Sequence, residues 1–191
     1  MNAYQQTIYL KEIPSSTTGA FWVSFEDHPR MVKTRGDIYG RCLPCIQNLY
    51  NQLKSGKTRI RLGNAYHCWK VTAVLDHLDL CFALLEKFST HAVPGPIYGK
   101  LGSGRSDAST RVLVFHTQDE AQRDQIRSAV DLSLKELKIA AKAEISRACA
   151  VLYHGLLGDW RNWQPITAIR HHERISGQIG YLKRVLYQSA L

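Results

Sequence analysis

The stretch from Arg111 to Leu137 constrains the fold most, because a strand pattern passes there directly into a helix pattern. It begins with RVLVFH, a β-branched and apolar run typical of a central strand. Thr117 and Glu120 have the spacing of a capping box, so we expect a long helix to begin there. Apolar residues then recur with helical spacing, at Ile126, Ala129, Val130, Leu134 and Leu137. Such a chain requires a sheet with helices packed against it.

Further strand and helix patterns surround this stretch. Strands are predicted at residues 7–13, 20–25, 58–62, 66–74 and 97–100, the first two as a hairpin. Helices are predicted at residues 44–55, 75–88, 145–156 and 175–186, and a long loop at 27–41. Between residues 58 and 62 the side chains alternate, so that Ile60 and Leu62 face the core while Arg59 and Arg61 face solvent.

Strands and helices are mixed without a regular βαβ alternation. The sequence therefore predicts an α+β fold, with a mixed or mainly antiparallel sheet, in a single domain over residues 1–191. A subdivision near residues 90–97, where Pro94-Gly95-Pro96 breaks the chain, is the alternative.

The strand and helix between Arg111 and Leu137 resemble the corresponding unit of ferredoxin-like domains. Such domains are common in prokaryotic RNA-binding and RNA-processing proteins, including those of CRISPR systems. The resemblance covers less than a third of the chain and implies a sheet that is ferredoxin-like in part. One fold carries many functions, so the resemblance alone assigns none.

The net charge is the bulk property that says most about function. The chain has 191 residues with 25 Lys and Arg against 16 Asp and Glu, a formal net charge of +9. Residues 29–70 hold nine basic residues and one acid, Asp37, and a second basic excess lies between Ser146 and Leu191. This concentration favours a polyanionic partner, which is a nucleic acid, a nucleotide or an anionic membrane. A soluble basic protein without an anionic partner is the alternative.

Composition excludes several other classes of protein. An apolar fraction of 45% and a charged fraction of 21% are those of a globular chain and exclude wholesale disorder. No apolar run reaches the roughly 20 residues that cross a bilayer, and residues 1–10 lack a signal-peptide pattern. We therefore expect a cytoplasmic protein without a membrane partner, whose five cysteines are reduced.

The first candidate site is a glycine-rich segment over residues 98–106, in which we interpret residues 99–105 as a loop. Glycine lets backbone amides approach an anion, and neighbouring cations add charge. The segment is neither a P-loop nor a dinucleotide fingerprint, and a plain hairpin connection is the alternative. The residues expected to bind phosphate are Lys100, Gly102, Gly104, Arg105 and the nearby Arg111.

The second candidate is the basic segment over residues 29–70, in which aromatic residues are interleaved with the cations. Basic side chains neutralise phosphates and aromatic rings stack on unpaired bases, whereas a solvated basic surface is the alternative. The predicted contacts are Arg30, Lys33, Arg35, Arg41, Lys57, Arg59, Arg61 and Trp69. Arg59 and Arg61 are the strongest candidates for contacts to the phosphate backbone, because one strand face presents both.

The third candidate consists of histidines. His171 and His172 lie between Arg170 and Arg174, and His116 ends a predicted strand. Histidine moves protons near neutral pH, so these residues are candidate catalytic groups for cleaving a phosphodiester. A surface pair near a helix start is the competing interpretation of His171 and His172.

Cysteine and carboxylate patterns predict no metal and no cofactor. Cys42-Leu43-Pro44-Cys45 has redox spacing, but it follows no hydrophobic strand and there is no second CxxC for zinc. Metal-dependent phosphoryl chemistry needs several carboxylates at one site, and acids are sparse near the basic segments.

Three functional hypotheses remain. The leading one is a nucleic-acid-binding protein, with RNA or single strands favoured because no helix-turn-helix is evident. The second is a metal-independent nuclease or nucleotide-processing enzyme. The third is a basic interaction subunit of a larger complex.

Overall fold

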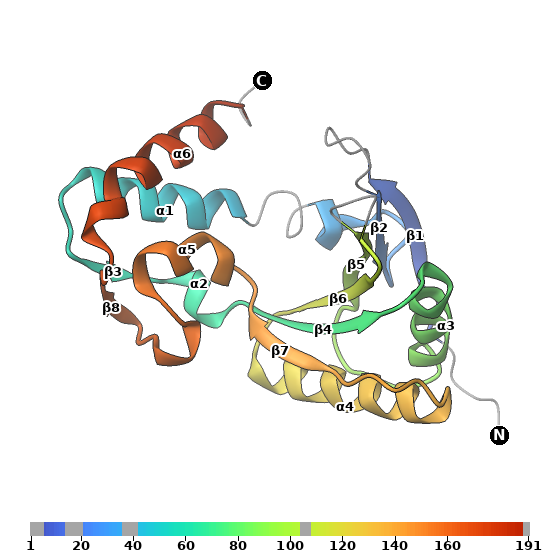
Figure 1. Ribbon diagram of the computed structural model, residues 1–191. Helices are drawn as coiled ribbons and strands as arrows, with labels where there is room; N and C mark the ends of the chain where they lie inside the picture. The colour runs from blue at the N-terminus through green and yellow to red at the C-terminus, as the bar shows by residue number, and fades with distance from the viewer. Residues whose placement is uncertain (1–5, 14–20, 36–41, 104–107, 189–191) are drawn as a thin grey trace. The chain divides into compact units, whose positions relative to one another are not determined.

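The computed structural model describes residues 6–13, 21–35, 42–103 and 108–188 (Figure 1). The chain divides into two compact units. The first unit comprises Met1–Ile38 and Trp69–Ile145, and the second comprises Tyr39–Cys68 and Ser146–Leu191. Residues 90–97 lie inside the first unit. Both units are therefore built from segments that are distant in sequence.

The first unit contains a six-stranded sheet in the order β1-β2-β5-β6-β4-β7. The pairs β1–β2, β2–β5, β5–β6 and β6–β4 are antiparallel. Its elements are β1 (Tyr9–Ile13), β2 (Phe21–Glu26), β4 (Trp69–Leu75), α3 (Leu78–Phe88), β5 (Tyr98–Ser103), β6 (Arg111–Thr117), α4 (Glu120–Glu136) and β7 (Glu144–Arg147). The last two residues of β7 belong to the second unit. The predicted α+β fold, its hairpin at β1–β2 and the central strand β6 are confirmed.

The elements from β4 to β7 follow the order β-α-β-β-α-β, with β6 between β5 and β4 in the sheet. This is the element order of ferredoxin-like domains, and β1 and β2 extend the sheet beyond β5. The helices α3 and α4 lie on the same face of the sheet (Figure 1). Phe115 joins the two layers, because its ring lies 5.1 Å from that of Phe25 on β2 and 4.5 Å from that of Phe88 on α3.

The second unit is mainly helical. It contains α1 (Cys42–Lys54), β3 (Arg59–Arg61), α2 (Asn64–His67), α5 (Ala150–Leu157), β8 (Ile166–Ala168), α6 (Ile175–Gln188) and short 3-10 turns at Trp160–Asn162 and His172–Arg174. Strands β3 and β8 form an antiparallel pair of their own. Fully buried Leu49, Ile60 and Leu156 lie in its core, and Tyr153 donates a hydrogen bond of 3.1 Å to the carbonyl of Cys45.

Several predicted boundaries are wrong, each for a local reason. The N-cap of α4 is Asp119 instead of Thr117, because the Asp119 carboxylate accepts a 2.8 Å hydrogen bond from the amide of Gln122. Tyr66 lies in α2, so the strand predicted from that residue begins only at Trp69. Ile145 belongs to β7, and the helix predicted from it begins at Ala150.

Candidate nucleic-acid interface

The two units differ sharply in charge. Counted over their full sequences, the first unit has fourteen basic and fourteen acidic residues. The second unit has eleven Lys and Arg against two acids, Asp159 and Glu173. The whole formal net charge of +9 therefore belongs to the second unit, which combines the basic segment before residue 69 with the one after residue 145.

Both acids of the second unit are engaged by neighbouring cations. Asp159 accepts from the backbone amide of Arg161 at 2.9 Å and from its guanidinium at 3.1 Å, and these bonds lower the pKa of Asp159. The Glu173 carboxylate lies 3.4 Å from Nδ1 of His171 and 3.8 Å from Nε of Arg174. The pKa of Glu173 is lowered by its own backbone amide and by these two neighbouring side chains. No other acid exists in this unit to neutralise its remaining cations.

Arg59 and Arg61 lie on one exposed face of the β3–β8 pair, as the alternating sequence predicted. Their register partners on β8 are Ala168 and Ile166, and both arginines are exposed. Ile60, between them, is fully buried. We call this pair of strands, with its two outward arginines, the arginine ribbon.

Side chains of α1 fix the other edge of β3. Gln52 donates to the carbonyl of Arg61 at 2.9 Å and accepts from its amide at 2.8 Å, while Asn48 donates to the same carbonyl at 2.9 Å. The exposed Lys57 is connected to α1 as well, since its amide donates to the carbonyl of Gln52. Strand β3 of the arginine ribbon is thus bonded along both edges, and its backbone presents Arg59 and Arg61 in a defined direction.

Three other cations of the predicted basic segment, Arg30, Lys33 and Arg35, belong to the first unit. Arg30, Lys33 and Arg35 follow β2, and the amide of Lys33 donates to the Glu26 carboxylate at 3.0 Å. Arg30 and Arg35 are exposed and Lys33 is half-buried. Arg41 lies outside the described residues. Residues 29–70 are therefore shared between the two units.

The glycine-rich segment is a strand over most of its described part. Lys100 and Gly102 lie in β5, paired with β2 on one side and with β6 on the other. The loop interpretation is wrong for these two residues, because a strand paired on both sides uses its backbone groups in the sheet. Gly104 and Arg105 lie outside the described residues. The guanidinium of Arg111 donates to the carbonyls of Ala108 and Thr110.

Trp69 is packed inside the first unit. It is 5% exposed, and the guanidinium of Arg123 lies 4.3 Å from the centre of its ring. A base cannot stack on this ring, because the 5% exposure of Trp69 leaves almost none of its surface accessible. Trp69 therefore has a structural role.

The candidate catalytic histidines are divided between the units. His116 lies on β6 of the first unit, where its ring stacks on Tyr98 with centroids 6.1 Å apart. His171 and His172 begin a 3-10 turn of the second unit, and His172 is exposed. His116 therefore belongs to one unit, and His171 and His172 belong to the other.

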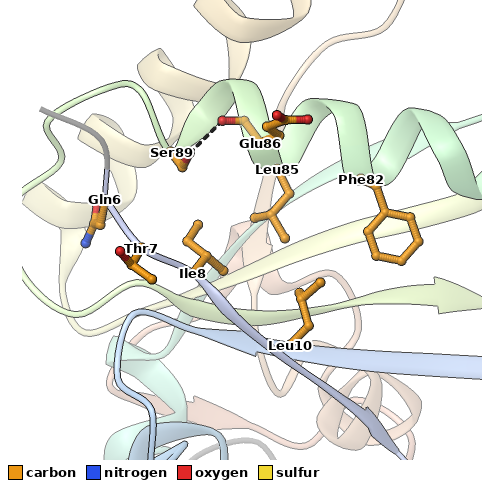
Figure 2. A pocket seen from close by; sticks show the side chains of 8 residues that line it. All are labelled: Gln6, Thr7, Ile8, Leu10, Phe82, Leu85, Glu86 and Ser89. Carbon is orange, nitrogen blue, oxygen red and sulfur yellow. Dashed lines mark hydrogen bonds between the residues drawn. The ribbon is translucent and has the colours of Figure 1, made fainter. Parts of the chain in front are cut away.

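The first unit has a cavity of about 550 Å³ between the chain entering β1 and helix α3. Figure 2 shows Ile8 and Leu10 on one side and Phe82 and Leu85 on the other. Glu86 is the charged residue of its lining. A cavity whose described lining has a carboxylate and no basic residue does not suit a polyanion.

Asn48 and Gln52 were missed as part of the interface by sequence analysis. They lie one helical turn apart on α1, and the amide of Gln52 donates to the side chain of Asn48 at 3.0 Å. A polar pair at i and i+4, next to the apolar stripe of a helix, is the only sequence signal that indicates them.

Two further findings concern the described residues. Among them, no three His, Cys, Asp or Glu side chains come close enough to hold a metal ion. No helix in these ranges has both the length and the apolar character to cross a membrane. Comparison of the chain with family models, with curated proteins and with solved structures found no match.

Proposed function

We propose that this protein binds nucleic acid, with RNA or single strands favoured, and that the second unit makes the principal contact to the phosphate backbone. The observation that carries the proposal is the partition of charge. The full +9 belongs to one unit, whose two acids are both engaged by their own neighbours. Such a concentration of cations releases counterions from a polyanion on binding.

The arginine ribbon supports this function through its geometry. Guanidinium groups bind phosphate through two parallel hydrogen bonds, and this geometry depends on the direction from which they approach. Arg59 and Arg61 project from a strand bonded on both edges, so the backbone needs little ordering on binding. The nuclease hypothesis stays a prediction, and the contacts of the described residues give no specific support for it.

The test is salt-dependent binding of labelled single-stranded RNA, single-stranded DNA and duplexes. The variant Arg59→Ala/Arg61→Ala is expected to bind more weakly, with the slope of log K against log salt reduced by about 1.4, or roughly 0.7 per lost phosphate contact. Stability should change by less than about 0.5 kcal/mol per site, because both side chains are exposed.

A matched control removes the same charge from the neutral unit. Arg127 and Lys135 are exposed on α4, and Arg127→Ala/Lys135→Ala is expected to leave affinity and slope close to those of the wild type. Equal losses in the two double variants would show that net charge alone matters and that the second unit is not the site. Binding of acidic polypeptides but of no nucleic acid would favour the interaction-subunit hypothesis instead.

A further inference from the structure

The sheet of the first unit has one face that helices α3 and α4 do not cover. Phe25, Leu101, Phe115 and Val71 point toward the helices and lie in the core. Side chains alternate along a strand, so their neighbours point the other way. The register places these neighbours in rows across the strands: Trp22, Gly102, Val112 and Val74 in one row, and Lys11, Ser24, Lys100, Val114 and Thr72 in the next. We call this the open face. Ser24 and Val114 are buried within it, whereas Lys11 and Val74 are exposed and Trp22, Lys100, Val112 and Thr72 are half-buried.

An aromatic ring and a cation meet on the open face. The ammonium of Lys100 lies 4.3 Å from the centre of the Trp22 ring, and both side chains are half-buried. Lys11 is exposed on the neighbouring strand, and both lysines are opposite Ser24 in the register. A tryptophan ring with lysines around it is the combination that binds unpaired bases and their phosphates.

The residues that share a row with Trp22 are small or apolar. Gly102 lies opposite Trp22, and a Cβ at that position would come 2.0 Å from the carbonyl oxygen of Phe21, so no side chain can stand there. Val112 is half-buried and Val74 is 48% exposed further along the row. This surface provides apolar contact next to the indole ring.

The charges of the first unit are segregated, although they sum to zero. Among the described strand residues on the open face, the basic ones are Lys11, Lys70 and Lys100 and the acidic one is Glu26, which is buried and accepts from two backbone amides. Helices α3 and α4, on the other face, carry six acids and four basic residues. The open face is thus complementary in charge to a polyanion.

We propose that the open face is a stacking site for the unpaired bases of a single-stranded nucleic acid, with a base on Trp22 and its phosphate near Lys100 and Lys11. This inference rests on the proposed function, because it takes the nucleic acid as the ligand. Paired bases are stacked within a duplex and cannot reach the ring, so the site selects single strands. An acidic peptide would satisfy the lysines but would gain no stacking.

The experiment compares two oligonucleotides of equal length and charge, oligouridine and an abasic strand without bases. The wild type is expected to bind oligouridine about 10-fold more tightly, which corresponds to one stacked base. Trp22→Ala should bring this ratio close to one while leaving the salt slope unchanged. Arg59→Ala/Arg61→Ala should weaken both strands equally and keep the ratio, which separates the two sites.

A second variant keeps the test valid if Trp22→Ala fails to fold. Trp22→Phe keeps a ring in the same place and is expected to retain an intermediate ratio. Quenching of tryptophan fluorescence by oligouridine should occur in the wild type and be largely lost in Trp22→Phe. Three outcomes would overturn this inference and leave the proposed function standing. The wild type could bind oligouridine and the abasic strand equally well, or Trp22→Ala could leave the ratio of the two affinities unchanged. The third outcome is displacement of oligouridine by polyglutamate at equal charge. No binding of either strand at low salt would refute both.

Discussion

The side-chain amide of Gln52 pairs with the backbone of Arg61 as a neighbouring strand would. It donates to the carbonyl oxygen of Arg61 at 2.9 Å and accepts from the amide N–H at 2.8 Å. A two-stranded ribbon is marginal in water when nothing supports it. Helix α1 supplies the missing edge through Gln52 and Asn48, and it thereby holds the residues proposed to contact phosphate.

Replacing Gln52 should therefore affect both stability and binding. Gln52→Ala leaves two backbone groups of Arg61 without this partner, so we expect a loss of about 1–2 kcal/mol in the free energy of unfolding and weaker RNA binding. Urea denaturation and a binding titration measure the two effects. Gln47→Ala is the control, because Gln47 is exposed on the same helix and its amide donates to the side chain of Asn51. Identical behaviour of the two variants would contradict a supporting role for Gln52.

Two glycines should respond in opposite directions to the same substitution. Gly102 has φ of +136°, and a Cβ there would lie 2.0 Å from the carbonyl oxygen of Phe21. Gly102→Ala is expected to lower the free energy of unfolding by at least about 2 kcal/mol. Gly177 lies in α6, and a Cβ added there would meet open space. Gly177→Ala should therefore raise the free energy of unfolding by about 0.5–1 kcal/mol. Denaturation of both variants tests the positions of these residues, and a loss at Gly177 would contradict the helix assignment.

Local patterns were enough to predict the elements in which one face is buried. The alternation around Ile60 placed Arg59 and Arg61 on the outside, and the apolar stripe of α4 from Ile126 to Leu134 is buried as expected. Both predictions succeed because burial imposes a period of 2.0 or 3.6 residues on a short window of sequence. Capping is decided by single hydrogen bonds, so Asp119 replaced Thr117 as the N-cap of α4.

Long-range pairing left no comparable signal. The glycines of β5 resembled a loop, yet β2 and β6 pair with that strand on both sides. The second unit joins Tyr39–Cys68 to Ser146–Leu191, and no window of sequence shows that these segments share a core. For the same reason Trp22 was recognised only as a strand residue, because its neighbours Lys100 and Gly102 are brought to it by strand register.

Cys81 should make stability fall at alkaline pH. Burial raises the pKa of this thiol from 9.0 to about 11, so the folded state binds the proton more tightly than the unfolded chain. The resulting stabilisation is complete below about pH 9 and is lost as the pH rises toward 11. Urea denaturation at pH 8 and pH 10.5 should show a steeper loss for the wild type than for Cys81→Ala. The comparison concerns the pH dependence, since the variant also removes a buried atom. Parallel profiles would show that the thiol does not titrate differently in the two states.

The acids of the two units offer a test in which net charge is held equal. Asp159→Asn and Asp124→Asn each add one positive charge, and each acid is bonded to a nearby arginine, Arg161 and Arg123 respectively. Asparagine retains the ability to cap a helix, so the turn after residue 159 should persist. In the second unit the change removes one of two acids and releases a guanidinium, so RNA affinity at low salt should rise by roughly 2- to 5-fold and the gain should vanish at high salt. In the neutral first unit Asp124→Asn should have little effect. If both variants bind RNA more tightly by the same factor, the position of the added charge does not matter. That result would contradict the proposal that the second unit is the interface.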